Sequence, residues 1–149
     1  MWNETGISDR ISPMVKIEIV YEGDLHCRLK HGPSGQEIVT DAPVDNGGKG
    51  EFFSPTDLAA SAMGSCMLTI MAISAQKHSI ELKGTRVEVL KEMITAPVRR
   101  IGKLTVQFFM PKGIDPSKRL ILERAAHSCP VHKSFNSDVE IPVSFQYPD

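Results

Sequence analysis

Two cysteines carry the strongest chemical signal in this sequence. Cys66 lies in a long apolar stretch, and Cys129 stands directly before a proline in the segment HSCPVHKSF, residues 127–135. A pair of thiols can cycle between the dithiol and a disulfide, so the first candidate chemistry is redox chemistry. A free cysteine can instead be a small, inert, buried hydrophobic residue. The spacing alone leaves both interpretations open.

The proline after Cys129 adds a local prediction. Pro130 cannot continue a helix that contains Cys129, but it suits the start of a new short helix over residues 130–135. Cys129 would cap that helix, and a thiol close to free backbone N–H groups has a lowered pKa. Cys66 lies too deep in its own helix for such help, so its activation needs a nearby cation or hydrogen-bond donors. This reasoning predicts that Cys129 is the more acidic thiol.

Other residues with chemical potential give weaker signals. His127 and His132 flank Cys129, and with Cys66 they make a poor four-ligand zinc set, so capping or solvated histidines are the preferred interpretation. In a phosphate-binding loop the glycines come directly after a strand and directly before a helix. The glycines of the segment 47–50 do not have this arrangement, so nucleotide binding is unsupported. Cys27 is interpreted as a small apolar side chain on a strand, without a chemical role. We therefore expect no resident metal and no cofactor.

Composition narrows the class of protein. The chain has 149 residues and a net charge of −1, which gives no electrostatic case for nucleic acid or an anionic membrane. The start of the chain shows no basic segment followed by an apolar run, and the three cysteines are too far apart for a disulfide framework. We expect a cytoplasmic protein, with a poorly structured arm over residues 1–13 and a single domain over residues 14–149.

The helix around Cys66 is the clearest predicted element. Ser54 suits the N-cap, Pro55 the first helical position, and Asp57 completes a capping box. Residues 56–79 are almost uncharged, which predicts a buried central helix or a membrane span about 36 Å long. Small polar residues dilute the stretch and no aromatic or basic anchors flank it, so we favour the buried helix. Because one small domain cannot cover such a helix on all sides, we expect a dimer.

Three methionines line this helix at four-residue steps: Met63, Met67 and Met71. Core packing explains them, although flexible thioether side chains would also suit a channel for an apolar substrate.

The remaining predicted elements are a second helix and local groups of strands. A second helix begins with Asp115 as its cap and Pro116 in its first turn, and its apolar stripe runs from Leu122 to Cys129. Period-two alternation predicts strands over residues 15–21, 25–31, 36–40, 86–92, 104–110 and 139–147. Pro142 marks the last one as an edge strand or a bulge. Local strand pairs separated by helices favour an α+β fold with a largely antiparallel sheet.

These residues resemble a known family. The segments SPTDLAASAMGSCMLTIMA (54–72) and RAAHSCPVHKSF (124–135) are similar to those of the OsmC/Ohr family of osmotically inducible and organic hydroperoxide resistance proteins. VYEGD (20–24), GGKGEFFSPTDL (47–58) and RIGKLTVQFFMP (100–111) fit the same pattern. The resemblance extends over almost the whole chain, from about Val15 to Tyr147.

The resemblance implies a fold and an activity. The fold is an intertwined homodimer with antiparallel sheets wrapped around long central helices and active sites at the subunit interface. The activity is reduction of organic hydroperoxides in the response to oxidative stress. Cys66 would be the peroxidatic thiolate and Cys129 the resolving thiol, with an external dithiol or lipoyl-type compound as reductant. On these roles the resemblance differs from the capping argument, which favoured Cys129 as the acidic thiol.

The chain departs from the family pattern in one respect. The best-studied branches place a glutamate after the helix-opening proline and an arginine in an earlier segment, whereas Thr56 follows Pro55 here and the loop before it has no arginine. This departure indicates a less characterised OsmC-like branch. It also motivates an alternative function, a non-catalytic binding protein for a small apolar or reactive-sulfur ligand. A zinc-holding protein is a third alternative.

Overall fold

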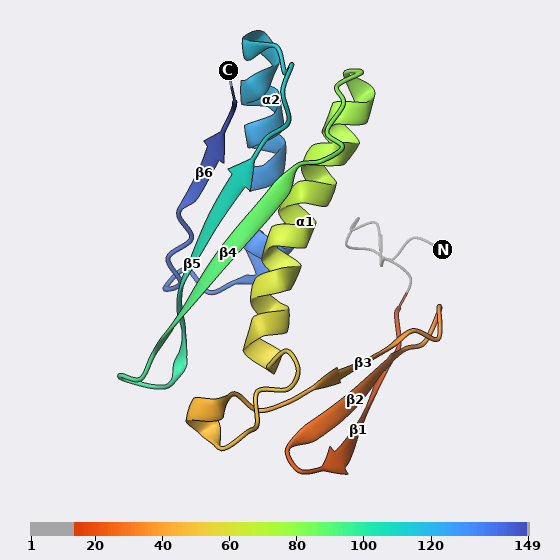
Figure 1. Ribbon diagram of the computed structural model, residues 1–149, viewed down its shortest axis with the longest axis vertical. Coiled ribbons are helices and arrows are strands. Elements are labelled where there is room, and N and C mark those ends of the chain that lie inside the picture. The colour runs from red at the N-terminus through yellow and green to blue at the C-terminus, as the bar shows by residue number, and fades with distance from the viewer. Residues whose placement is uncertain (1–13, 149) are drawn as a thin grey trace, which may run out of the picture. The chain divides into compact units, whose positions relative to one another are not determined.

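The computed structural model describes residues 14–148, so the arm expected over residues 1–13 lies outside the described residues. The described chain divides into two compact units, an N-terminal unit that ends at Ser54 and a C-terminal unit that begins at Pro55. Each unit contains one three-stranded sheet, and the C-terminal unit also contains the three α-helices (Figure 1). The α+β class is confirmed. The single domain expected over residues 14–149 stays a prediction.

The N-terminal unit is an antiparallel sheet followed by a loop. Its strands lie in the order β1 (Ile17–Gly23), β2 (His26–His31) and β3 (Glu37–Thr40), and a short 3-10 helix, η1 (Val44–Asn46), follows in the loop. All three strands were predicted to within two residues at each end. Directly opposed residues of an antiparallel pair share a face, so the register collects six apolar side chains on one face. They are Ile17, Ile19, Tyr21, Cys27, Leu29 and Ile38.

This apolar face of the N-terminal sheet is open. Ile17, Ile19 and Tyr21 are each about 60% exposed, although their alternation predicts a half-buried strand. The buried residues among positions 14–54 are all polar: Thr40, Asp41 and Ser54. The expected burial of β1 is therefore not found within one chain.

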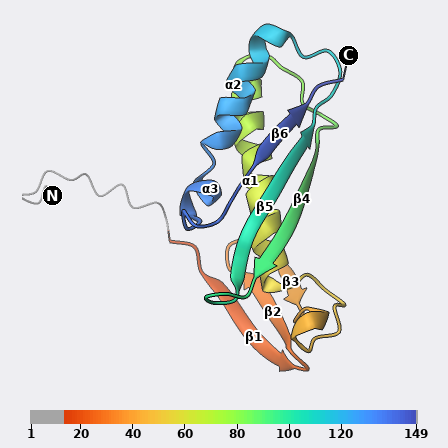
Figure 2. The same cartoon turned by 90° about the vertical axis from the view of Figure 1, so that its left-hand side faces the viewer.

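The C-terminal unit packs helices on one face of a mixed sheet (Figure 2). β4 (Arg86–Ile94) pairs antiparallel with β5 (Arg100–Phe109), and β6 (Val143–Gln146) pairs parallel with β5 at the sheet edge. The edge position agrees with Pro142, which cannot donate a ladder hydrogen bond. The parallel direction departs from the largely antiparallel sheet expected, because α2 (Pro116–His127) and α3 (Pro130–Ser134) carry the chain back between β5 and β6.

The core of this unit forms between α1 (Pro55–Lys77), the sheet and α2. One stripe of α1 is buried and contains Met63, Met67 and Met71, all fully inaccessible. β5 contributes Leu104, Val106 and Phe108, and the Phe108 ring stacks on Phe145 of β6 with centroids 4.8 Å apart. The three methionines therefore serve the core, as predicted.

The helix α1 is covered unevenly around its circumference. Gly64 sits where β4 approaches closely, since a Cβ there would lie 2.8 Å from a methyl group of Val89. On the opposite side Ile73 is 46% exposed. In length and composition α1 is the one helix of the described residues that could cross a membrane, a test that core helices of globular proteins also pass.

Candidate functional site

Cys66 lies on α1 at the border of the buried stripe. Its neighbour Met67 is fully buried, whereas the Cys66 side chain is half-buried. α1 begins at Pro55 and runs without interruption past Cys66 to Lys77, as the sequence predicted. The long helix therefore holds this thiol on a rigid support, in contact with the core and still accessible.

Cys129 is placed by two consecutive helices. α2 begins with Asp115 as N-cap, whose carboxylate accepts a 2.8 Å hydrogen bond from the Ser117 N–H, and ends at His127. Cys129 then leaves the helical conformation, with φ −53° and ψ 127°, as residues before proline do, and α3 starts at Pro130. The Cys129 Sγ caps α3 and accepts a hydrogen bond from the His132 N–H at 3.5 Å. The predicted new helix and the predicted capping role are both confirmed.

The side chains of Cys66 and Cys129 lie next to each other. Cys129 is completely buried, and its side chain forms a hydrogen bond with that of Cys66 although 62 residues separate them. Both cysteines are free thiols in this structure. Contacts of α1 with α2 and with α3 bring the cysteines together. The arrangement is a reduced dithiol whose sulfur atoms are neighbours.

The expected acidity of Cys129 is wrong. Burial, followed by the hydrogen bond with Cys66, raises the pKa of Cys129, and the backbone N–H groups of His132 and Val131 offset this only in part. The dipole of a one-turn helix cannot outweigh the loss of hydration in a fully buried position. The Cys129 thiol therefore holds its proton more strongly than an exposed thiol does.

The two histidines next to Cys129 lie close to each other. The His127 and His132 rings lie edge to face with centroids 6.3 Å apart, and burial lowers the pKa of His132. Within residues 14–148, no set of three His, Cys, Asp or Glu donor atoms converges around Cys129. The zinc alternative finds no support at this position.

The N-terminal end of α1 has a cation that sequence reasoning missed. Lys91 of β4 donates to Thr56 Oγ1 at 2.8 Å and to Asp57 Oδ1 at 2.6 Å. Thr56 occupies the position at which the best-studied branches of the family resembled in sequence carry a glutamate. The Asp57 carboxylate, assigned in advance to a capping box, thus also pairs with an ammonium. Only the fold reveals this partner, because residues 34 positions apart share no sequence pattern.

The arginine of the first hairpin is engaged elsewhere. Arg28 binds Glu22 through Nε at 2.6 Å and Glu37 through a terminal nitrogen at 3.3 Å, all on the polar face of the N-terminal sheet. Its guanidinium therefore has two carboxylate partners within its own sheet.

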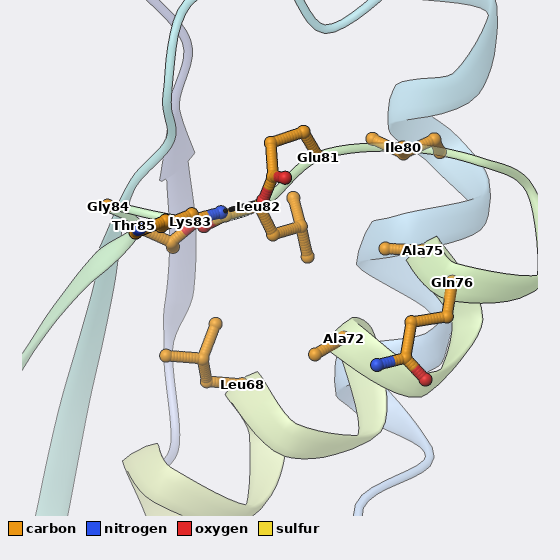
Figure 3. A pocket seen from close by; sticks show the side chains of 10 residues that line it. All are labelled: Leu68, Ala72, Ala75, Gln76, Ile80, Glu81, Leu82, Lys83, Gly84 and Thr85. Carbon is orange, nitrogen blue, oxygen red and sulfur yellow. Dashed lines mark hydrogen bonds between the residues drawn. The ribbon is translucent and has the colours of Figure 1, made fainter.

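A surface hollow of about 490 Å³ lies at the other end of α1. Figure 3 shows Leu68 and Ala72 of α1 facing the segment 80–85 across it. Neither cysteine lines this hollow, so it is separate from the thiol pair.

Known proteins provide the context for this geometry. The family model for OsmC-like protein matches residues 48–144, which is more than half of the chain. No curated protein matches the chain. A crystal structure from Psychrobacter arcticus, named for osmotic stress induction and a detoxification response, is 40% identical with a TM-score of 0.84. The match covers 92% of this chain and 99% of that one.

More distant structures share the fold. An organic hydroperoxide resistance protein OsmC from Legionella pneumophila is 15% identical with a TM-score of 0.73, covering 89% of this chain and 96% of that one. The organic hydroperoxide resistance protein OhrB of Bacillus subtilis is 19% identical with a TM-score of 0.65, covering 89% and 98%. The family model and the 40% identical relative together show that this chain belongs to the OsmC/Ohr family of OsmC-like proteins.

Proposed function

We propose that this protein is a thiol-dependent peroxidase that reduces organic hydroperoxides in the response to oxidative stress. The observation that carries the proposal is the hydrogen bond between the Cys66 and Cys129 side chains, one half-buried and the other fully buried. Organic hydroperoxide resistance proteins from Legionella pneumophila and Bacillus subtilis share this fold.

The half-buried thiol takes the first step. The Cys66 thiolate attacks one oxygen of the hydroperoxide, the O–O bond breaks, and the alcohol leaves after taking up a proton. Cys66 becomes a sulfenic acid, the reversible first stage of cysteine oxidation. We infer that the Cys129 side chain, which lies beside that of Cys66, donates its S–H to the Cys66 sulfur in this step. This contact supplies one of the activating donors that the sequence left unidentified.

The buried thiol takes the second step. Cys129 attacks the sulfenic sulfur, water leaves, and a Cys66–Cys129 disulfide forms. An external dithiol, of lipoyl type or similar, then reduces the disulfide by exchange and is itself oxidised, so that two electrons pass to the hydroperoxide in each cycle. Burial of Cys129 keeps its proton in place until the sulfenic acid appears next to it. No metal or cofactor enters this cycle.

A homodimer is part of the proposal. The open apolar face of the N-terminal sheet and the exposed side of α1 are unusual for a lone soluble chain, and a second copy is the simplest cover for them. Burying isoleucine or tyrosine side chains of this kind stabilises an interface by roughly 1.5–3 kcal/mol each. We place the protein in the cytoplasm, where a dithiol reductant is available.

Oxidation by one equivalent of cumene hydroperoxide tests the thiol cycle. Mass spectrometry is expected to find a Cys66–Cys129 disulfide. Cys66→Ser is expected to abolish turnover, and Cys129→Ser to leave a sulfenic acid on Cys66 that dimedone traps. Cys27→Ser is the matched control, because Cys27 lies on β2, and it should turn over like the parent protein. A folded protein whose two thiols stay reduced would refute the peroxidase.

The hollow at the end of α1 favours a second candidate function, a non-catalytic binding protein for a small apolar ligand. Its lining includes Leu68, Ile80 and Leu82, and it does not reach the cysteines. Thermal stabilisation of the Cys66→Ser/Cys129→Ser variant by a fatty acid, equal to that of the parent chain, would favour binding over catalysis. A stabilisation that requires the thiols would favour the peroxidase.

A further inference from the structure

Three side chains of the N-terminal unit converge away from the thiol pair. His26 comes from β2, Asp41 follows β3 directly, and Glu51 lies in the loop after η1. His26 Nε2 lies 3.5 Å from Asp41 Oδ1 and 3.6 Å from Glu51 Oε2, and the three donor atoms are all within 4.8 Å of one another. Strand alternation puts Cys27, the next residue after His26, on the opposite face of the sheet.

Asp41 is the unusual member of this cluster, because its side chain is completely buried. Its Oδ2 accepts hydrogen bonds from the Lys49 N–H at 3.2 Å and the Glu51 N–H at 3.0 Å. Its Oδ1 and the facing His26 Nε2 have no hydrogen-bond partner within residues 14–148. The closest polar contact of this buried oxygen is the His26 nitrogen 3.5 Å away, which is longer than a normal hydrogen bond. A buried carboxylate oxygen without a hydrogen bond is costly, and its separation from the imidazole nitrogen fits a ligand shared by both groups.

We propose that His26, Asp41 and Glu51 form a binding site for a first-row divalent metal ion, with Zn²⁺ as the best fit. Metal–ligand bonds of about 2.0–2.1 Å put two ligands of a tetrahedral ion about 3.3–3.4 Å apart. The two separations from His26 Nε2, 3.5 and 3.6 Å, need only a small contraction, and the exposed Glu51 side chain can move to close its separation from Asp41, which is within 4.8 Å. Neighbouring ligands of an octahedral Mg²⁺ would lie only about 2.9 Å apart.

The donor types agree with this choice. Mg²⁺ and Ca²⁺ prefer oxygen ligands throughout, whereas an imidazole next to carboxylates suits Zn²⁺ and its neighbours in the first transition row. Three protein ligands leave a fourth position for water. The Glu51 side chain is 53% exposed, which gives the ion a path from solvent and lets this carboxylate adjust its position.

The glycine-rich loop is shaped to hold Asp41. A Cβ at Gly48 would collide with the carbonyl oxygen of Ala42, and Gly50 has a φ of +67°, which side-chain-bearing residues rarely adopt. These two glycines let the loop fold back so that the N–H groups of Lys49 and Glu51 reach the carboxylate. Outer hydrogen bonds of this kind orient a metal ligand and strengthen its site. The glycine-rich segment 47–50 is thus a support for one buried side chain.

Calorimetric titration with ZnCl₂ tests the site. The titrated protein carries Cys27→Ser, Cys66→Ser and Cys129→Ser, so that thiolates cannot compete for zinc. We expect one equivalent of Zn²⁺ to bind, and His26→Gln or Asp41→Asn to weaken binding by at least about 10- to 100-fold. Two matched controls on the same sheet, His31→Gln and Glu37→Gln, should leave the affinity unchanged. Absence of binding, or binding that survives Asp41→Asn, would overturn the proposal.

A second measurement uses the parent chain, in case the triple cysteine variant fails to fold. Co²⁺ replaces Zn²⁺ and reports its ligands by absorption: nitrogen and oxygen ligands give only weak visible bands, whereas thiolates add an intense near-ultraviolet band. We expect weak visible bands that disappear with His26→Gln. An intense near-ultraviolet band that persists in His26→Gln would assign the metal to the cysteines and overturn the site.

Discussion

The two units of this chain support their candidate chemistry in different ways. In the C-terminal unit, the thiol pair is held by helices whose apolar faces fill a core of methionine, leucine, valine and phenylalanine side chains. In the N-terminal unit, the residues fully buried are polar, and the His26, Asp41 and Glu51 cluster is held by a sheet and backbone hydrogen bonds. One site depends on apolar packing and the other on polar contacts.

This difference determines where each unit is vulnerable. Apolar packing tolerates small shifts, because neighbouring side chains can change rotamers, but it is weakened by cavities. A loop held by a few hydrogen bonds has few buried side chains whose truncation would leave a cavity. It is destabilised when an added side chain clashes with its main chain. Substitutions of similar size should therefore act differently in the two units.

A cavity in the C-terminal core is expected to have the largest effect. Met67 is fully buried next to Cys66, and Met67→Ala should lower the free energy of unfolding by about 3 kcal/mol, from lost burial and the cavity left behind. Chemical denaturation followed by circular dichroism measures this change. Leu90→Ala is the control, since Leu90 is 64% exposed on β4, and it should change stability by less than about 0.5 kcal/mol. Equal losses in the two variants would contradict the description of the core.

A blocked backbone in the N-terminal loop is expected to come next. Gly48→Ala puts a methyl group against the main chain of Ala42, which cannot rotate away, and should cost about 2 kcal/mol. Gly64→Ala is the matched change in the C-terminal unit. There the crowding atoms are methyl groups of Val87 and Val89, which give way more readily than a main-chain carbonyl, and alanine favours a helix over glycine by about 1 kcal/mol. If Gly64→Ala proves the more damaging in thermal unfolding, the contrast between the units is wrong.

Sequence reasoning succeeded where the signal is local. Asp115 and Pro116 predicted the start of α2, and Pro130 predicted the start of α3. Strict alternation identified β1 and β4. These signals are reliable because caps, prolines and period-two patterns act through neighbouring residues. It did not predict that β6 runs parallel to β5. That direction depends on how α2 and α3 pack, which no local pattern encodes.

The exposed face of β1 marks the limit of this reasoning. Alternation correctly assigned Ile17, Ile19 and Tyr21 to one face, but it could not say whether the cover comes from the same chain. Under the proposed dimer, Ile19→Ser should raise the dissociation constant about tenfold, or about 1.4 kcal/mol, by removing apolar contact with the partner. Sedimentation equilibrium measures this constant. Val98→Ser, in the exposed turn between β4 and β5, is the control, and a parent protein that is monomeric at all concentrations would refute the dimer.

The candidate sites show the same limit. The meeting of Cys66 with Cys129 was foreseen, because both thiols lie on apolar faces of helices and the family resemblance pairs them. Lys91 with Asp57, and His26 with Asp41 and Glu51, were missed, because their partners are far apart in the sequence and belong to no repeating pattern. The direction of the Cys129 pKa was wrong, because burial is a property of the whole fold and outweighs the helix end that the sequence shows.

The raised pKa of Cys129 predicts a dependence of folding stability on pH, which is the smallest of the expected effects and concerns the C-terminal site. Burial and Cys66 raise the pKa of Cys129 above its ordinary value of 9.0, so above about pH 9 the unfolded chain loses a proton that the folded chain keeps. The contribution is complete below pH 9 and is lost as the pH rises toward the folded-state pKa. One proton accounts for at most about 1.4 kcal/mol per pH unit.

Urea denaturation between about pH 7.5 and 9.5 measures this slope, below the range in which Tyr147, whose pKa is also raised by burial, begins to contribute. Cys129→Ser should remove the decline above pH 9, and Cys27→Ser, which removes a thiol from the N-terminal sheet, should keep it. A decline that survives Cys129→Ser would assign the proton to another group. It would also remove the argument that Cys129 stays protonated beside Cys66 until a sulfenic acid forms.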